Sequence, residues 1–140
     1  MGVGMAAFGE LASQVARREK EAELLFVGDA YREAIGRYYE SSPAGHKRYP
    51  KSLEQLLKDE RFAFNRRYLR RLYRDPVTGK DWATVEAPEG GIMGVRSPSE
   101  APPAKSGNFP PGYEAFEGAA RYADWQFVYS VPGGAVASNK

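Results

Sequence analysis

The chain has 140 residues, enough for one domain with a modest core, and its composition excludes several classes of protein. Hydrophobic residues make up 42% of it and charged residues 27%, which argues against wholesale disorder. Because the net charge is only +2, binding to nucleic acid or to a membrane would need a local basic patch. No cysteine is present and His46 is the only histidine, which excludes thiol catalysis, disulfides and multi-histidine metal sites.

The first residues, 1–9 (MGVGMAAFG), are apolar but too few to cross a bilayer, which takes about 20 residues. A secretory signal peptide fits poorly, since no basic n-region precedes this stretch and no cleavage site follows it. Two interpretations stay open at this point. The stretch is either the frayed start of a helix or the end of a longer apolar helix whose first part is missing.

The sequence predicts one long helix over residues 1–40, because no proline interrupts it and apolar residues recur at steps of three and four. Gly28 and Gly36 each weaken such a helix by about 1 kcal/mol relative to alanine, and we expect them to mark close packing. A helix about three times the mean length must project from so small a domain or meet another chain. The predicted packing stripe consists of Leu11, Val15, Leu24, Val27, Tyr31, Ile35 and Tyr38.

Two short helices are predicted next, over residues 50–58 and 65–74. Ser52 is the expected N-cap of the first, with Gln55 at the capping-box position. If residues 65–74 form a helix, the five arginines of that helix fall within about 140° of its circumference. This basic face has three open interpretations: a solvated surface, a docking face for carboxylates of a protein partner, or a phosphate-binding face for nucleic acid or lipid headgroups. The five are Arg66, Arg67, Arg70, Arg71 and Arg74.

The remainder of the chain is rich in β-forming residues and turns. We expect a hairpin link at residues 88–91, a long loop over residues 97–113 and a frayed tail at 133–140. The predicted fold class is α+β, with a long N-terminal helix packed on a three-stranded antiparallel sheet and a headpiece over residues 41–132. The three strands are expected at residues 82–86, 91–96 and 125–131.

Residues 73–82, YRDPVTGKDW, have the density of polar groups that a catalytic or metal loop would have. They lack the glycine spacing of a phosphate-binding loop, and we expect Asp75 and Asp81 to brace a turn rather than to hold a metal. His46 has no serine or carboxylate placed beside it to make a catalytic triad. The sequence therefore predicts a protein that is not an enzyme.

Together, the order of these parts and several local strings resemble the pseudopilins of bacterial type II secretion, within the type IV pilin-like superfamily. The resemblance covers roughly residues 5–130 and is specific for the family rather than for one member. The similar strings are residues 18–28, 31–39, 49–57, 67–76, 90–95 and 125–129.

This resemblance implies a structural subunit of a secretion pseudopilus or pilus-like filament that acts through subunit packing and has no small-molecule substrate. It implies an inner-membrane precursor with its headpiece in the periplasm, cut by a prepilin peptidase before a Phe-x-x-x-Glu start. The chain lacks that motif, so the resemblance favours residues 1–9 as the end of a truncated membrane helix. The implied partners are other pilin or pseudopilin subunits and inner-membrane components of the secretion system.

Major pseudopilins of this kind also hold Ca²⁺ in their C-terminal loops through acidic residues. After Gly112 this chain has only Glu114, Glu117 and Asp124, so we do not carry the site over and expect no cofactor. The alternative function is a nucleic-acid-binding module that uses the arginines of residues 66–74.

Overall fold

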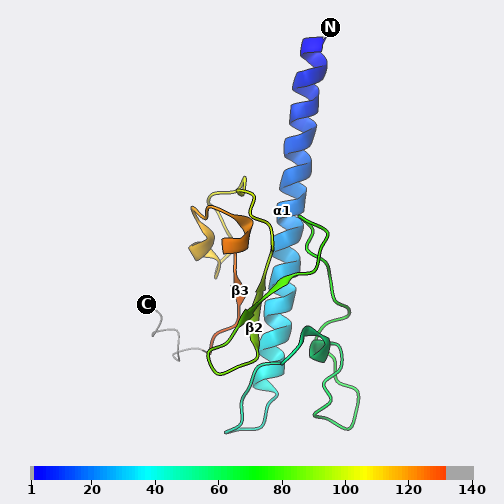
Figure 1. Cartoon of the computed structure of the whole chain (residues 1–140), viewed down its shortest axis with the longest axis vertical. Coiled ribbons are helices and arrows are strands. Elements are labelled where there is room, and N and C mark those ends of the chain that lie inside the picture. Colours follow the sequence, from blue (N-terminus) through cyan, green and yellow to red (C-terminus); the bar gives the residue numbers. More distant parts are fainter. Residues whose placement is uncertain (1, 132–140) are drawn as a thin grey trace.

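The structure is a computed structural model that describes residues 2–131, with side chains from residue 12 onward. A single long helix, α1 (Gly2–Glu40), runs through the molecule, and the other elements gather around its C-terminal half (Figure 1). The strands are β1 (Ala83–Glu86), β2 (Ile92–Arg96) and β3 (Phe127–Val128). Three short 3-10 turns complete the fold: η1 (Leu53–Leu56), η2 (Glu114–Phe116) and η3 (Tyr122–Asp124).

The strands form one antiparallel sheet in the order β1-β2-β3, which confirms the predicted α+β layout. The predicted hairpin link is also present, since Gly90 and Gly91 take φ of 105° and 87° between β1 and β2. Such positive φ values favour glycine, which lacks a Cβ. β3 is much shorter than the predicted 125–131; it begins late because Trp125 still caps the η3 turn and donates its backbone N–H to the carbonyl of Tyr122.

Five members of the predicted stripe are buried in the core, as the helical spacing predicts. The glycines of α1 allow β3 to approach this face closely. A Cβ placed on Gly28 would lie 2.5 Å from the ring of Phe127, and one on Gly36 would lie 2.7 Å from the ring of Tyr129. The expectation of close packing at these glycines is therefore confirmed. The five buried residues are Leu24, Val27, Tyr31, Ile35 and Tyr38.

Val15, another member of the predicted stripe, is 50% exposed, and packing of the N-terminal members of the stripe on another chain stays a prediction. Nine residues separate Val15 from Leu24, and at about 100° per residue this distance amounts to two and a half turns. Val15 therefore lies on the side of α1 opposite Leu24. The side chain of Leu11 lies outside the described part of the structure, as do the predicted tail residues 133–140.

The two predicted short helices differ from what the structure contains. The first is reduced to the single 3-10 turn η1, where Ser52 makes no capping hydrogen bond through its side chain. Gln55 Oε1 instead accepts from the backbone N–H of Lys51 at 2.9 Å. The predicted helix over residues 65–74 is wrong, since that segment has no helical residue.

Within the part of the chain that the structure describes, we find no helix with the length and apolar character needed to cross a membrane.

Candidate interaction surfaces

Residues 66–74 run as an irregular segment beside the C-terminal half of α1, with neither helix nor strand. Leu56 fixes this path, because its carbonyl accepts the backbone N–H groups of both Tyr68 and Leu69, at 2.8 and 3.1 Å. Tyr68 and Leu69 are adjacent in sequence and both buried. A backbone that bonds to a neighbouring loop cannot also form the helical i to i−4 ladder, so tertiary contacts override the amphipathic pattern.

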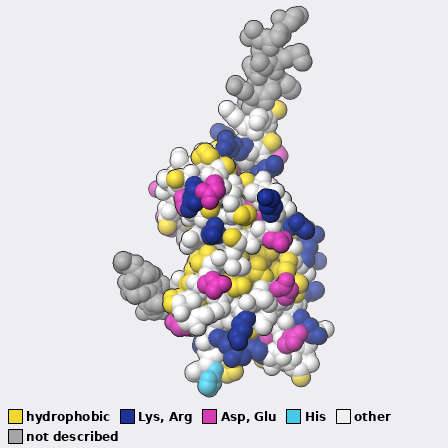
Figure 2. All heavy atoms as spheres, viewed as in Figure 1, with side chains coloured by type: hydrophobic (Ala, Val, Ile, Leu, Met, Phe, Trp, Pro, Cys, Tyr) yellow, Lys and Arg dark blue, Asp and Glu magenta, His cyan; other side chains and the backbone are white. Residues whose placement is uncertain are grey.

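The five arginines therefore do not share one helical face. Arg66 turns inward, with its guanidinium 4.8 Å from the ring centre of Phe62 and a hydrogen bond to Ser41. The other four are exposed, and among residues 12–131 none has a carboxylate within ion-pair distance. In Figure 2 a row of Lys and Arg side chains lies along the right-hand edge of the headpiece, the edge on which this segment runs in Figure 1. We call these four the basic segment: Arg67, Arg70, Arg71 and Arg74.

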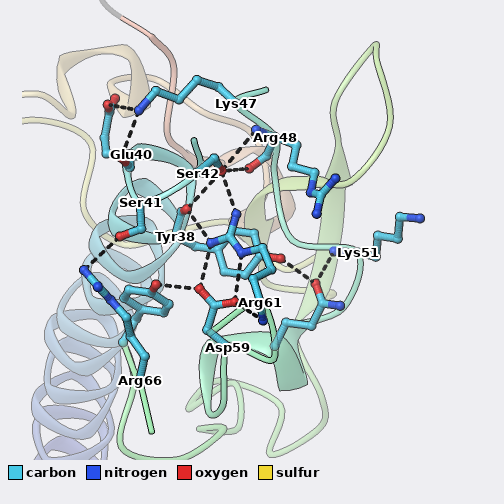
Figure 3. Close-up of polar contacts among 12 residues, drawn as sticks. Tyr38, Glu40, Ser41, Ser42, Lys47, Arg48, Lys51, Asp59, Arg61 and Arg66 are labelled. Atoms are coloured by element: carbon cyan, nitrogen blue, oxygen red, sulfur yellow. Dashed lines mark hydrogen bonds and ion pairs between the residues drawn. The ribbon is translucent and has the colours of Figure 1, made fainter. Parts of the chain in front are cut away.

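Arg61 differs from these arginines because it is held in a buried network at the C-terminal end of α1 (Figure 3). Its guanidinium pairs with Asp59 at 2.7 Å, donates to the carbonyl of Tyr38 at 2.9 Å and to Ser42 Oγ at 2.7 Å. It also stacks on the Tyr38 ring, 3.7 Å from the ring centre. A cation at this place satisfies a carbonyl that the helix leaves free and complements the negative end of its dipole.

The carboxylate of Asp59 is the anionic centre of the same network and is fully buried. Burial opposes its ionisation, but hydrogen bonds from Arg61 and from the hydroxyl of Tyr68 outweigh that effect and hold the pKa of Asp59 below its ordinary value. The network closes α1 onto the loop that follows η1. Its role is to position that loop, and with it the start of the basic segment.

The N-terminal part of α1 presents a second surface, on the side away from the sheet. Residues 12–20 are all exposed, and further along the helix Phe26 is 72% exposed. Glu19, Glu23 and Glu33 lie around Phe26 and are exposed as well. Among residues 12–131 no basic group pairs with any of the three. We call Glu19, Glu23, Phe26 and Glu33 the acidic face.

The opposite side of α1 is held to the long loop by Glu21, which is only 3% exposed. Its Oε2 accepts the backbone N–H of Ala104 at 2.6 Å and the hydroxyl of Tyr122 at 2.5 Å. Burial, and then this hydrogen bond, raise the pKa of Tyr122 to about 12. Glu21 therefore serves to dock the loop rather than to pair with Arg17, whose guanidinium donates to the carbonyl of Pro102.

The residue 73–82 loop is a braced turn built on Asp75, whose side chain is fully buried. Its carboxylate accepts from the backbone N–H groups of Val77 and Thr78, from Thr78 Oγ1 at 2.6 Å and from Ser97 Oγ at 2.9 Å. These four hydrogen bonds hold the Asp75 carboxylate inside the turn. Asp81, by contrast, is exposed.

The other residues considered for chemistry lie apart from one another. Glu114 accepts the backbone N–H of Gly112, Asp124 pairs with Arg121 at 2.8 Å, and His46 is exposed in the loop after α1. In the described part of the chain we find no group of three or more acidic, histidine or cysteine side chains that would hold a metal ion.

Sequence reasoning missed the Asp59–Arg61 network and the acidic face. The network joins residues from α1 and two loops, and no local spacing in the sequence indicates that these residues come into contact. The acidic face could have been predicted from the sequence, because Phe26 falls outside the stripe that contains Leu24 and Val27. An aromatic residue on the polar side of an amphipathic helix is the available signal.

Comparisons of the chain with protein-family models, with curated proteins and with solved structures gave no match.

Proposed function

We propose that this protein is a non-enzymatic structural subunit of a pilin-like filament, of the kind formed by type II secretion pseudopilins. One observation carries the proposal: α1 buries side chains against its headpiece only from Glu21 onward, within the described residues 12–40. Its buried contacts begin at Glu21 and Leu24, whereas residues 12–20 are exposed. A 39-residue helix extends about 58 Å at 1.5 Å per residue, more than so small a head covers.

The arrangement of the surface supports the same proposal. Val15 is an exposed apolar residue on the free part of α1, and Phe26 is one on the side of α1 away from the sheet; burial of such groups against another chain stabilises contact by about 25 cal/mol per Å². The polar clusters around Asp75, Asp59 and Glu21 serve to close turns or dock loops. In this proposal the partners are other subunits and inner-membrane components of the secretion system, the headpiece lies in the periplasm, and a prepilin peptidase processes the precursor.

The proposal is tested by reading the coding DNA upstream of Met1 and by expressing the gene with that region in its host. We expect about 20 apolar codons that begin with a Phe-x-x-x-Glu motif, since a bilayer span needs that length. Mass spectrometry of the protein from membranes should then find an N-terminus cut before the phenylalanine. An upstream region without an apolar span, or a membrane-free protein with an uncut N-terminus, would contradict the proposal.

The alternative of nucleic-acid binding depended on a helix over residues 65–74, which the structure lacks. The exposed arginines still permit a direct test by fluorescence anisotropy with labelled DNA and RNA across a range of salt. A filament subunit should bind only weakly. Tight binding with a steep salt dependence, lost in the Arg70→Glu/Arg71→Glu variant, would favour the alternative.

A further inference from the structure

The sheet has an open edge along β1. β1 pairs only with β2, and among residues 12–131 no backbone group of Ala83–Glu86 has a hydrogen bond outside that pair. The bonds of β2 show which groups are left open. Tyr129 donates its backbone N–H to the carbonyl of Met93, so Met93 and Val95 face β3. Thr84 lies opposite Val95, and its own N–H and carbonyl therefore point outward from the sheet.

A groove of about 610 Å³ lies at this edge, between β1, η1 and residues 72–74. Trp82, just before β1, and Thr84 and Glu86 within it line the groove through their side chains, since alternate residues of a strand share one face. Leu53 and Leu72 line the facing walls and are partly buried. Ligand sites have volumes of about 300–1,000 Å³, so the groove has room for several side chains of a ligand.

The open edge and the charges of the groove together indicate the class of ligand. N–H and carbonyl groups repeated along a strand are matched by the backbone of a second extended polypeptide. Two cations and three carboxylates line the groove, and among residues 12–131 none of the five is in an ion pair. Because their signs nearly cancel, the groove does not attract a polyanion such as nucleic acid. The five are Lys51, Arg74, Glu54, Asp81 and Glu86.

Pairing of β1 with the β1 strand of a second copy is disfavoured. β1 is only four residues long, and the carboxylates of Asp81 and Glu86 stand near its two ends. Short strands with charged ends resist edge-to-edge pairing. The large apolar side chain next to β1 that a second copy would have to insert, Trp82, is already buried in its own core against Tyr31 and Phe127. The groove therefore fits a short segment of a different protein.

We propose that β1 binds an extended segment of a partner protein as a further strand of the sheet, with alternate apolar side chains of that segment in the groove. The segment is close to neutral and has no proline where it pairs, since proline donates no N–H. Backbone hydrogen bonds supply the affinity, and the side chains of Leu53, Leu72 and Trp82 supply the selectivity. The inference does not rest on the filament proposal, because the contact leaves the exposed N-terminal part of α1 free.

A phage-displayed library of random heptapeptides, selected on the immobilised 140-residue chain, tests this site. Enriched peptides should alternate apolar and polar residues, lack a central proline and bind Thr84→Pro at least about tenfold more weakly than wild type. Proline removes the outward N–H of Thr84, and an edge strand tolerates it where that N–H faces solvent. The matched control is Thr84→Val, which keeps the N–H and should bind within about twofold of wild type.

Alternate N-methylation of the enriched peptide gives a second measurement, which needs no protein variant. Only every other N–H of a bound strand faces β1. Methylation of one alternate set of nitrogens should therefore abolish binding, while methylation of the other set should leave the affinity within about threefold. In the complex, hydrogen exchange at the amide of Thr84 should slow by about tenfold or more, because that N–H becomes hydrogen-bonded.

Several outcomes would overturn the site. These are a library without enriched peptides, peptides that bind Thr84→Pro as well as wild type, and equal loss of binding with both methylated sets. The methylated peptides decide the matter even where urea unfolding finds Thr84→Pro unstable. Dimers of the chain that dissociate in Thr84→Pro would mean that two copies pair through β1, which would overturn the assignment to a different protein.

Discussion

The close approach of Phe127 to Gly28 provides a sharp test of how tightly the sheet fits on α1. In Gly28→Ala, the new Cβ would lie 2.5 Å from the Phe127 ring, about 1 Å inside the optimum separation of about 3.5–4.0 Å. Phe127 is fully buried and its ring meets Trp82, Tyr113 and Phe116. The ring therefore cannot move away without displacing other aromatic side chains.

Two opposing effects determine how much Gly28→Ala changes the free energy of unfolding. Alanine in a helix interior stabilises by about 1 kcal/mol relative to glycine, whereas overpacking of a core costs about 1–3 kcal/mol. With the overlap this large, we expect Gly28→Ala to lower the free energy of unfolding by about 1–2 kcal/mol. Gly36→Ala is the matched control, because the Tyr129 ring is only partly buried and has fewer buried neighbours to displace than Phe127; the stability of this variant should stay within about 0.5 kcal/mol of wild type.

Urea unfolding, followed by the fluorescence of the two buried tryptophans, measures both variants. With a slope of about 1.5 kcal/mol per M, a loss of about 1.5 kcal/mol moves the midpoint by about 1 M. Phe127→Leu in the Gly28→Ala background should cost less than it costs alone, since leucine vacates part of the clash. A Gly28→Ala variant that is more stable than wild type by the full helix-propensity gain would refute this reasoning.

Three further predictions concern the buried polar groups. Asp75→Ala should destabilise by about 2–4 kcal/mol in urea, because it leaves several buried donors unpaired, while Asp75→Asn should cost less. Asp59, whose pKa is lowered in the fold, contributes stability that is fully present above the unfolded value of about 4 and is lost as pH falls through its folded pKa. The stability gap between wild type and Asp59→Asn should therefore narrow below about pH 4. Burial raises the pKa of Tyr31 to about 12, so stability is present below pH 10 and is lost as pH rises toward 12. Tyrosinate absorbance against pH should follow that loss, and Tyr31→Phe should make the loss shallower.

The long helix and the sheet could be predicted from sequence because their patterns are local. A proline-free stretch with apolar steps of three and four predicts a helix, and β-forming runs linked by paired glycines predict a hairpin. The close packing at Gly28 and Gly36 could also be predicted. Glycine inside a helix destabilises it, so its presence there often marks a place where another element packs closely.

The segment over residues 65–74 shows where such reasoning fails. Its arginines and apolar residues repeat with helical spacing, but Tyr68 and Leu69 give their backbone N–H groups to Leu56. That partner is more than ten residues away, so periodicity within the segment carries no information about it. The Asp59–Arg61 network escapes prediction for the same reason, because it joins α1 to a loop through Tyr38 and Ser42.

The nine-residue step from Val15 to Leu24 places an exposed and a buried apolar residue on opposite sides of one helix. A step of seven or eleven residues would have kept both on one face, since each returns to nearly the same angle at about 3.6 residues per turn. Nine residues instead move the apolar surface half a turn around α1. The C-terminal half can then bury Leu24 and its successors against the sheet, while Val15, nearer the N-terminus, and Phe26, level with Leu24 and Val27, face outward on the other side of α1. In the proposed filament, one side of α1 holds the head and the other side meets a neighbour.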